Sequence, residues 1–268
     1  MKRTGRAVML VFVLLMGLVL VNAGTTVSYA DTFFTEGDFR YAVTTGDKVL
    51  LAGYNGDSMD VILPEAVNGR AVVGVRTGSF ENASIHSVVI PEGYTTIGAF
   101  AFSGCQSLET VLLPASLKTI GMMAFNDCVT LSEIDFDAAK QLESISFGAF
   151  RNCPSLSGVY LPETITEIGD NAFAPANAVI CFEDTAAAAY CQNSGAAQAR
   201  ILKKIMGDVN FDTDVNINDV TAIQRHLCES ERFAPYQMIT TDRNGDGRVS
   251  VDDATLIQML IAEFDIQW

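Results

Sequence analysis

Apolar and polar residues alternate in short stretches that recur through the middle of the chain, and each stretch follows a Ser-Phe or Ala-Phe pair. The phenylalanines recur every 22 to 25 residues, at Phe80, Phe102, Phe125, Phe150 and Phe173. Each unit reads as an apolar anchor, an alternating strand, a turn usually marked by proline, and then Ile, often followed by Gly. A single unit cannot bury its apolar side alone, whereas stacked units share a continuous core. The pattern predicts a mainly β solenoid.

Two apolar positions in each strand are expected to face the core, because side chains alternate along a strand. These pairs are Val88 and Ile90, Val111 and Leu113, Ile134 and Phe136, and Val159 and Leu161. The phenylalanines are expected to line the opposite wall. A cysteine stands three residues after three of them, at Cys105, Cys128 and Cys153. Equivalent places in stacked repeats favour buried thiols over disulfides.

The residues between the inward positions are expected to form two columns on the exposed sheet face. One column carries Ser87, Thr110, Glu133 and Gly158, and the other carries Val89, Leu112, Asp135 and Tyr160. A ligand-binding surface and an ordinary solvated sheet face both fit this mixture. The candidate binding residues of the repeats are Thr110, Leu112, Glu133, Asp135 and Tyr160.

The repeated units "AFSGCQSLETVLLPASLKTIG" and "AFRNCPSLSGVYLPETITEIG" resemble leucine-rich repeats of the BspA-like kind found on bacterial surface proteins. The resemblance covers roughly residues 80–173. It implies a strand-rich segment before the repeats and a cap after them, built of a strand, a short alanine-rich helix and a final strand. We expect this module to occupy residues 31–205.

Oxygen-bearing side chains cluster twice near the C-terminus, in "DVNFDTDVNIND" and, 34 residues later, in "DRNGDGRVSVDD". In both copies they fall at loop positions 1, 3, 5, 9 and 12, with a backbone carbonyl expected at position 7, which is the spacing of a calcium-binding EF-hand loop. The first candidate set is Asp208, Asn210, Asp212, Asp214, Asn216 and Asp219; the second is Asp242, Asn244, Asp246, Arg248, Ser250 and Asp253. One such stretch fits a solvated acidic turn, but two in register favour a pair of calcium sites.

An apolar helical spacing follows each loop, at Val220, Ile223 and Leu227 and again at Ala254, Ile257 and Ile261. Position 12 is Asp rather than Glu in both copies, and no helix of normal length is recognisable before either loop. With these features, residues 206–268 resemble a type I-like dockerin, a small all-α module of two EF-hand-like loop-helix repeats. The resemblance implies two structural calcium ions and a cohesin domain on a scaffold protein as the partner.

The resemblance also assigns the cohesin contacts to loop positions 10 and 11 and to the helix residues after them. These are Ile217, Asn218, Gln224, Arg225, Val251, Asp252, Gln258 and Met259. The two copies differ, which favours one preferred docking orientation. Phe211 and Thr213 stand where glycine is usual, and Thr213 disfavours the positive φ that glycine permits. We therefore expect the first site to bind calcium more weakly, unless the surrounding fold compensates for the strain.

Residues 1–30 have the order of a secretory signal, with a basic start, an apolar run of about fifteen residues and a small-residue end. Cleavage is expected at the Ala30–Asp31 bond or after Ala23. The alternative is a retained membrane anchor, for which the run is short, since a span needs about 20 residues. Cleavage would leave 14 Lys and Arg against 32 Asp and Glu, a net charge of about −18. That charge disfavours nucleic acid and anionic membranes as partners.

An exported chain with six cysteines invites a disulfide framework. Cys181 and Cys191 are the pair that a short strand and a helix would bring together, either as a disulfide or as two thiols. Cys228 has no evident partner in the sequence.

The modules together indicate a secreted, non-catalytic adaptor that docks onto a bacterial cellulosome scaffold, an assembly for polysaccharide catabolism, and displays the repeats. It would be extracellular or associated with the cell surface, and not an integral membrane protein once the signal is cleaved. An alternative is an adhesin whose repeats bind plant cell wall or a host surface directly. An enzyme is disfavoured, because the chain has two histidines, no GxSxG motif and no room for another domain. Glu133 and Asp135 are the carboxylate pair that hydrolysis would use.

Overall fold

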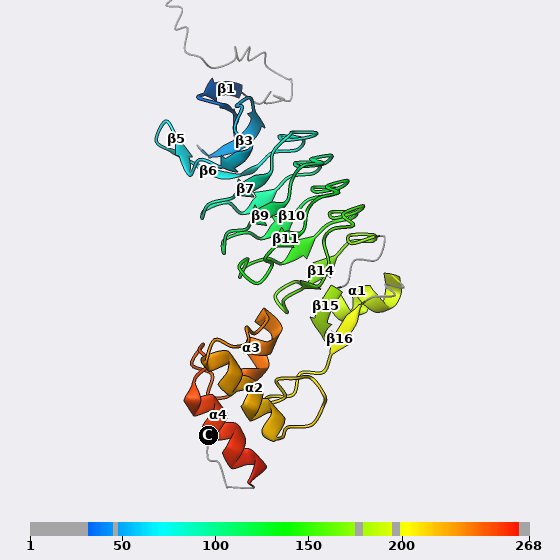
Figure 1. The fold of residues 1–268 in the computed structure, drawn as a ribbon. Coiled ribbons are helices and arrows are strands. Elements are labelled where there is room, and N and C mark those ends of the chain that lie inside the picture. The colour runs from blue at the N-terminus through cyan, green and yellow to red at the C-terminus, as the bar shows by residue number, and fades with distance from the viewer. Residues whose placement is uncertain (1–31, 45–47, 175–178, 195–198, 263–268) are drawn as a thin grey trace, which may run out of the picture.

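The computed structural model describes residues 32–44, 48–174, 179–194 and 199–262. They form a β-rich repeat module, here residues 32–202, followed by a helical C-terminal module, residues 206–262 (Figure 1). The expected leader at 1–30 lies outside the described residues. Within the described part of the chain, no helix is both long enough and apolar enough to cross a membrane.

The strand-rich segment predicted before the repeats is present. An antiparallel meander opens the module, and β3 then pairs in parallel with β6, where the solenoid begins. A short antiparallel strand, β5, lies beside β6. These strands are β1 (Thr32–Glu36), β2 (Phe39–Val43), β3 (Val49–Tyr54), β5 (Ala66–Val67) and β6 (Arg70–Val75).

Two parallel strand ladders run along the solenoid, each gaining one strand per repeat. The first extends from β6 through β8 (Thr96–Ile97), β10 (Thr119–Ile120), β12 (Ser144–Ile145) and β14 (Glu167–Ile168). The second contains β4 (Asp60–Ile62), β7 (Ser87–Val89), β9 (Thr110–Leu112) and β11 (Glu133–Ile134). Each strand pairs in register with the equivalent residues of the next turn, so equivalent side chains stack into columns.

The core lies between these ladders and is built as the alternation predicts. The inward pairs are buried, except that Ile134 is half-buried and packs against the core. The phenylalanines stack face to face, with ring centroids 4.9 Å apart for Phe80 and Phe102 and 5.1 Å apart for Phe102 and Phe125. The Cys128 thiol donates to the Phe102 carbonyl oxygen of the preceding turn at 3.1 Å, and Cys105 and Cys153 repeat this contact. The three cysteines are therefore buried thiols, as expected.

The second ladder ends at β11. The Asp135 carboxylate accepts hydrogen bonds from the backbone N–H groups of Asp137 and Ala138, at 2.9 and 3.3 Å. This Asx-type turn diverts the chain immediately after the strand. The equivalent strand of the following repeat, β13 (Val159–Tyr160), pairs with β15 (Val179–Phe182) instead.

The predicted terminal cap is present as β15, helix α1 (Ala186–Ser194) and β16 (Arg200–Leu202). Because β13 belongs to this sheet and not to the second ladder, the expected exposed position of Tyr160 is wrong. Its side chain is only 7% exposed, between the cap and the C-terminal module.

The C-terminal module contains α2 (Ile217–Leu227), α3 (Pro235–Thr241) and α4 (Val251–Ile261). Helices α2 and α4 follow the two loops as predicted and enclose a small core that includes Val220, Ile223, Ala254 and Ile257. Leu227 and Ile261, expected in this core, are exposed at the last turns of α2 and α4, so the expectation is wrong for these two residues. Helix α3, of seven residues, was not predicted; its sequence signal is Pro235 at the first helical turn.

Candidate calcium-binding and docking site

The first acidic loop is held by its own carboxylates. Asp208 accepts the N–H of Thr213 on Oδ2 at 2.9 Å and the N–H of Asp212 on Oδ1 at 3.2 Å. Asp219, at the far end of the loop, accepts from Val209 at 2.8 Å and from Asn216 at 2.8 Å. The first and last ligand positions are thus brought to the base of one loop.

The second loop repeats these bonds 34 residues later. Asp242 accepts the N–H of Gly247 at 2.8 Å, and Asp253 accepts from Arg243 and from Ser250, each at 2.8 Å. In both loops the fifth-position aspartate accepts from the seventh residue at 2.9 Å. Equivalent residues therefore take equivalent places, as the register of the sequence predicts.

Positions 9 and 12 of each loop also start the helix that follows. Asn216 caps α2 and Ser250 caps α4, and in each case the position-12 aspartate accepts the cap's backbone N–H to complete a capping box. The loops are consequently fixed to the helices, so an interaction that orders a loop also orders the first turn of the helix after it.

Three of the loop carboxylates are buried, at Asp208, Asp219 and Asp253. Burial raises the pKa of the Asp208 carboxyl above its ordinary value, and Asp219 adds to this, while the N–H of Thr213 acts in the opposite direction. The like charges of Asp208 and Asp219 within the first loop favour binding of a counter-charge.

Left-handed backbone is required twice in each loop. In the second loop Gly245 (φ 73°) and Gly247 (φ 82°) supply it, and a Cβ on either would meet nothing within 4 Å. In the first loop Phe211 (φ 58°) and Thr213 (φ 75°) adopt the same conformation. Such a φ costs a residue with a Cβ about 1–2 kcal/mol. The first loop therefore reaches the same shape with more backbone strain.

The donors of each loop are carboxylate, amide, hydroxyl and backbone oxygens, which suit a hard cation such as calcium. Over the described residues, no three His, Cys, Asp or Glu side chains converge as a metal cluster. In each loop the aspartates at positions 1, 5 and 12 accept backbone N–H groups and share the ligand set with side-chain amide or hydroxyl oxygens and a backbone oxygen. Asp208 Oδ2, Asp212 Oδ1 and Asp242 Oδ2 each accept one of these hydrogen bonds, so a second lone pair on each leaves capacity for a cation.

The side chains assigned to cohesin contact lie on the surface of α2 and α4. Ile217 is 59% exposed and Val251 is 68% exposed, although both are large aliphatic residues. Asn218, Gln224, Arg225, Asp252 and Gln258 are also exposed, and Met259 is half-buried. The predicted contact residues are therefore accessible at the starts and along the outer faces of the two helices.

The exposed face of the second ladder carries part of the predicted repeat surface. Thr110 donates to Glu133 at 3.3 Å, and Leu112, 47% exposed, pairs in register with Val89 of the preceding strand. Val89 in turn pairs with Ile62 of β4, which the sequence did not single out and which is also exposed. The face thus offers an aliphatic column beside a polar and acidic one.

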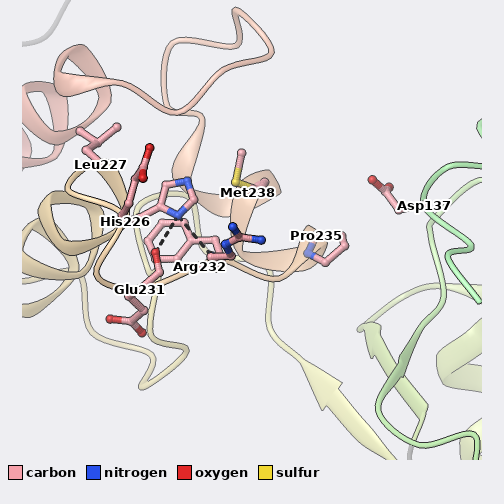
Figure 2. Close-up of a pocket in the computed structure, with 9 residues that line it drawn as sticks. Asp137, His226, Leu227, Glu231, Arg232, Pro235 and Met238 are labelled. Carbon is pink, nitrogen blue, oxygen red and sulfur yellow. Dashed lines mark hydrogen bonds between the residues drawn. The ribbon is translucent and has the colours of Figure 1, made fainter. Parts of the chain in front are cut away.

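An open hollow lies where the two modules meet. Figure 2 shows His226 and Arg232 on the side of the C-terminal module and Asp137, from the turn after β11, on the other side. The His226 ring stacks on Phe233 at 4.3 Å, and the N–H of Phe233 donates to its Nδ1 at 3.2 Å. None of the eight predicted cohesin-contact residues lines this hollow.

Cys181 of β15 and Cys191 of α1 lie beside each other as two buried thiols. The Cys181 thiol has a raised pKa, chiefly through its hydrogen bond with Cys191. Cys228 is exposed.

Comparisons with known families divide the chain in the same way. The model of the BspA-type leucine-rich repeat region matches residues 74–182 in six copies. The model of the dockerin type I domain matches residues 206–262. Among proteins with curated descriptions, none matches the chain.

Solved structures resemble the repeat module. A leucine-rich repeat protein of T. pallidum is 33% identical with a TM-score of 0.51, over 54% of this chain and 68% of that protein. A leucine-rich cell surface protein from Faecalibacterium prausnitzii is 23% identical with a TM-score of 0.41, over 57% of this chain and 56% of that protein. A leucine-rich repeat protein from Bacteroides capillosus is 19% identical with a TM-score of 0.38, over 63% of this chain and 97% of that protein.

Proposed function

Because the chain belongs to the BspA-type leucine-rich repeat proteins and ends in a dockerin type I domain, we propose that it is a secreted, non-catalytic adaptor. Its dockerin binds a cohesin of a cellulosome-type scaffold, and its repeats are displayed to a second partner. The observation that carries this proposal is the pair of in-register loops, each joined to a capped helix with an exposed aliphatic residue at its start.

Dockerin type I domains typically bind calcium. In this chain Asp208, Asn210, Asp212, Asn216 and Asp219 would hold one ion with the Asp214 carbonyl, and the equivalent residues from Asp242 to Asp253 would hold the other. Each ion would offset the repulsion between the carboxylates of its own loop and fix a helix start, so its role is structural. The helices then present Ile217 and Val251 to the cohesin.

The repeat face supplies the displayed surface. Its aliphatic column of Ile62, Val89 and Leu112 lies beside Thr110 and Glu133. Asp135 contributes its charge, but its carboxylate is already bound to two backbone N–H groups. Such a mixed face suits a protein or glycan surface better than an enclosed substrate. The same surface would serve an adhesin, in which it binds plant wall or host material directly.

The docking claim is tested with the full chain and a panel of recombinant cohesin domains, by surface plasmon resonance with calcium or with EDTA. We expect binding only with calcium, and loss of binding in the double variant Asp208→Ala, Asp242→Ala. Asp57→Ala removes an exposed carboxylate of the repeat module and should leave binding unchanged. Binding that persisted in EDTA, with unchanged helical circular dichroism, would contradict the calcium assignment.

The displayed surface is tested by immobilising the full chain through its cohesin and offering wall polysaccharides and culture proteins. Leu112→Glu should abolish capture of the second partner, whereas Met122→Glu, an exposed apolar residue outside both strand ladders, should not. Capture of polysaccharide alone favours the adhesin role. Hydrolysis of a polysaccharide that is lost in the Glu133→Gln, Asp135→Asn variant would overturn the non-catalytic assignment.

A further inference from the structure

Apolar side chains from the two modules meet in one cluster, which we call the junction. The repeat module contributes Tyr160, Phe182 and Leu202, all buried, and the dockerin contributes Phe211, Tyr236 and Ile239. Ring centroids are 5.8 Å apart for Tyr160 and Tyr236, 6.2 Å for Phe182 and Phe211, and 5.5 Å for Phe211 and Tyr236. The junction is therefore a small shared core and not a chance approach of two surfaces.

Phe211 belongs to the first calcium loop, at the position where the second loop has Gly245. Both residues have left-handed backbone, but only Phe211 has a side chain, and its ring contacts are with Phe182 of the repeat module and Tyr236 of α3. A phenylalanine at a strained position thus finds its packing in the neighbouring module.

The connection between the modules is short and held at both ends. Lys204 forms an ion pair with Glu163 of the last repeat at 2.7 Å and lies 5.6 Å from the centre of the Phe182 ring. A few residues later, the N–H of Gly207 donates to the Thr240 carbonyl oxygen of α3 at 2.8 Å. The connection therefore adds to the junction instead of separating the modules as a flexible linker would.

We propose that calcium binding by the first loop and the folding of the solenoid's terminal cap are coupled through Phe211, so that the two modules act as one unit. The inference rests on the calcium binding proposed above. An ordered loop places the Phe211 ring over β15 and β16, and a folded cap in turn favours the strained loop backbone. Because such coupling is reciprocal, removing calcium must loosen the cap.

The junction does not cover the residues predicted to contact the cohesin. None of the eight predicted cohesin-contact residues belongs to the junction. The repeat module would therefore support the dockerin from one side while α2 and α4 present the other, and the displayed repeat face would have a fixed direction relative to the scaffold.

The test is amide hydrogen exchange in the full chain, with saturating calcium and with EDTA. Calcium removal should speed exchange in β15 and β16 at least tenfold and leave β8 and β10, deep in the solenoid, unchanged. Phe211→Gly should abolish this response to calcium. Tyr236→Ser, which removes a ring from the dockerin side of the junction, should do the same and serves if the first variant folds poorly.

Tyr160→Phe is the matched control. It keeps the ring and removes a buried hydroxyl that has no hydrogen-bond partner in the described part of the chain. The response to calcium should persist in this variant. A response retained in Phe211→Gly, or a wild-type cap whose exchange ignores calcium, would overturn the coupling.

Titration calorimetry and cohesin binding, measured on the same samples, separate the two proposals. Absence of calcium binding would defeat both. Calcium binding and cohesin capture without any change in the cap would defeat the coupling alone and leave the docking function standing.

Discussion

Exchanging the sixth residues of the two loops provides a quantitative test of backbone strain. Thr213→Gly relieves a left-handed φ of 75°, and Gly247→Thr imposes strain at a φ of 82°. Thr213 is exposed, and its N–H bond to Asp208 survives the change, so no packing or hydrogen bond is lost. A Cβ at Gly247 meets nothing within 4 Å, so the effect of Gly247→Thr reports backbone strain and not steric overlap.

The magnitude follows from two opposing terms. Left-handed backbone costs threonine about 1–2 kcal/mol. Glycine gives back about 0.5–1 kcal/mol through the greater conformational freedom of the loop before calcium orders it. The net effect is about 0.5–1 kcal/mol, or about a two- to five-fold change in the calcium dissociation constant. Thr213→Gly should therefore tighten the first site by this factor, and Gly247→Thr should weaken the second by a similar one.

Calcium titration calorimetry of the full chain measures both sites, and urea unfolding followed by helical circular dichroism at fixed free calcium gives an independent value. In the double variant Thr213→Gly, Gly247→Thr, the free energy of calcium binding summed over both sites should stay close to the wild-type value. The first site should then be the tighter of the two. Unchanged or weaker binding in Thr213→Gly, or undiminished binding in Gly247→Thr, would show that loop strain does not set calcium affinity.

Three further predictions concern the repeat module, each read from urea unfolding. Phe125→Ala removes a ring stacked 5.1 Å from each of two neighbours and should lower the free energy of unfolding by about 3–5 kcal/mol. Phe147→Ala, at a side chain 39% exposed, should lower it by about 0.5 kcal/mol. Equal losses would refute the stacked rings as the source of stability. Glu92 accepts the N–H of Ala115 in the next turn at 2.8 Å, which lowers the pKa of its carboxyl. Its stabilising effect should be present above the pKa of the unfolded chain and disappear as the pH falls through the lowered folded value, so Glu92→Ala should be less stable than wild type at neutral pH and equal to it in acid. Asp135→Ala removes the turn after β11 and should cost about 1 kcal/mol, more than Glu133→Ala on the adjacent strand; the reverse order would refute the turn's role.

The solenoid was predictable because its signals are local and repeated. Alternation around Val111 and Leu113 assigns a strand face within a few residues, and the recurrence of Phe and Cys aligns the turns without tertiary information. The shape of the two acidic loops was predictable for the same reason, since Asp208 and Asp242 each begin a self-contained spacing of oxygen-bearing side chains.

The sequence predictions that failed concern which strand or side chain a residue packs against, because the alternation of apolar and polar residues does not specify this. Tyr160 has the pattern of an exposed strand residue, but its strand joins the cap sheet after the turn at Asp135 diverts the chain. In the sequence, Phe211 only departs from the glycine that is usual at its loop position. Its partner Phe182 is distant in sequence and belongs to the other module, so the contact could not be predicted. Helix α3 is too short for an apolar period to emerge, which left Pro235 as its only signal.

The in-register stacking of turns has a consequence for how such proteins vary between relatives. A repeat that runs from one core phenylalanine to the next begins and ends at equivalent positions. Inserting or deleting one whole repeat therefore preserves the in-register stacking of the remaining repeats. Adjacent parallel strands lie about 4.8 Å apart, so the length of the solenoid changes in steps of that size. Each added repeat would move the N-terminal strands one step further from the junction with the dockerin.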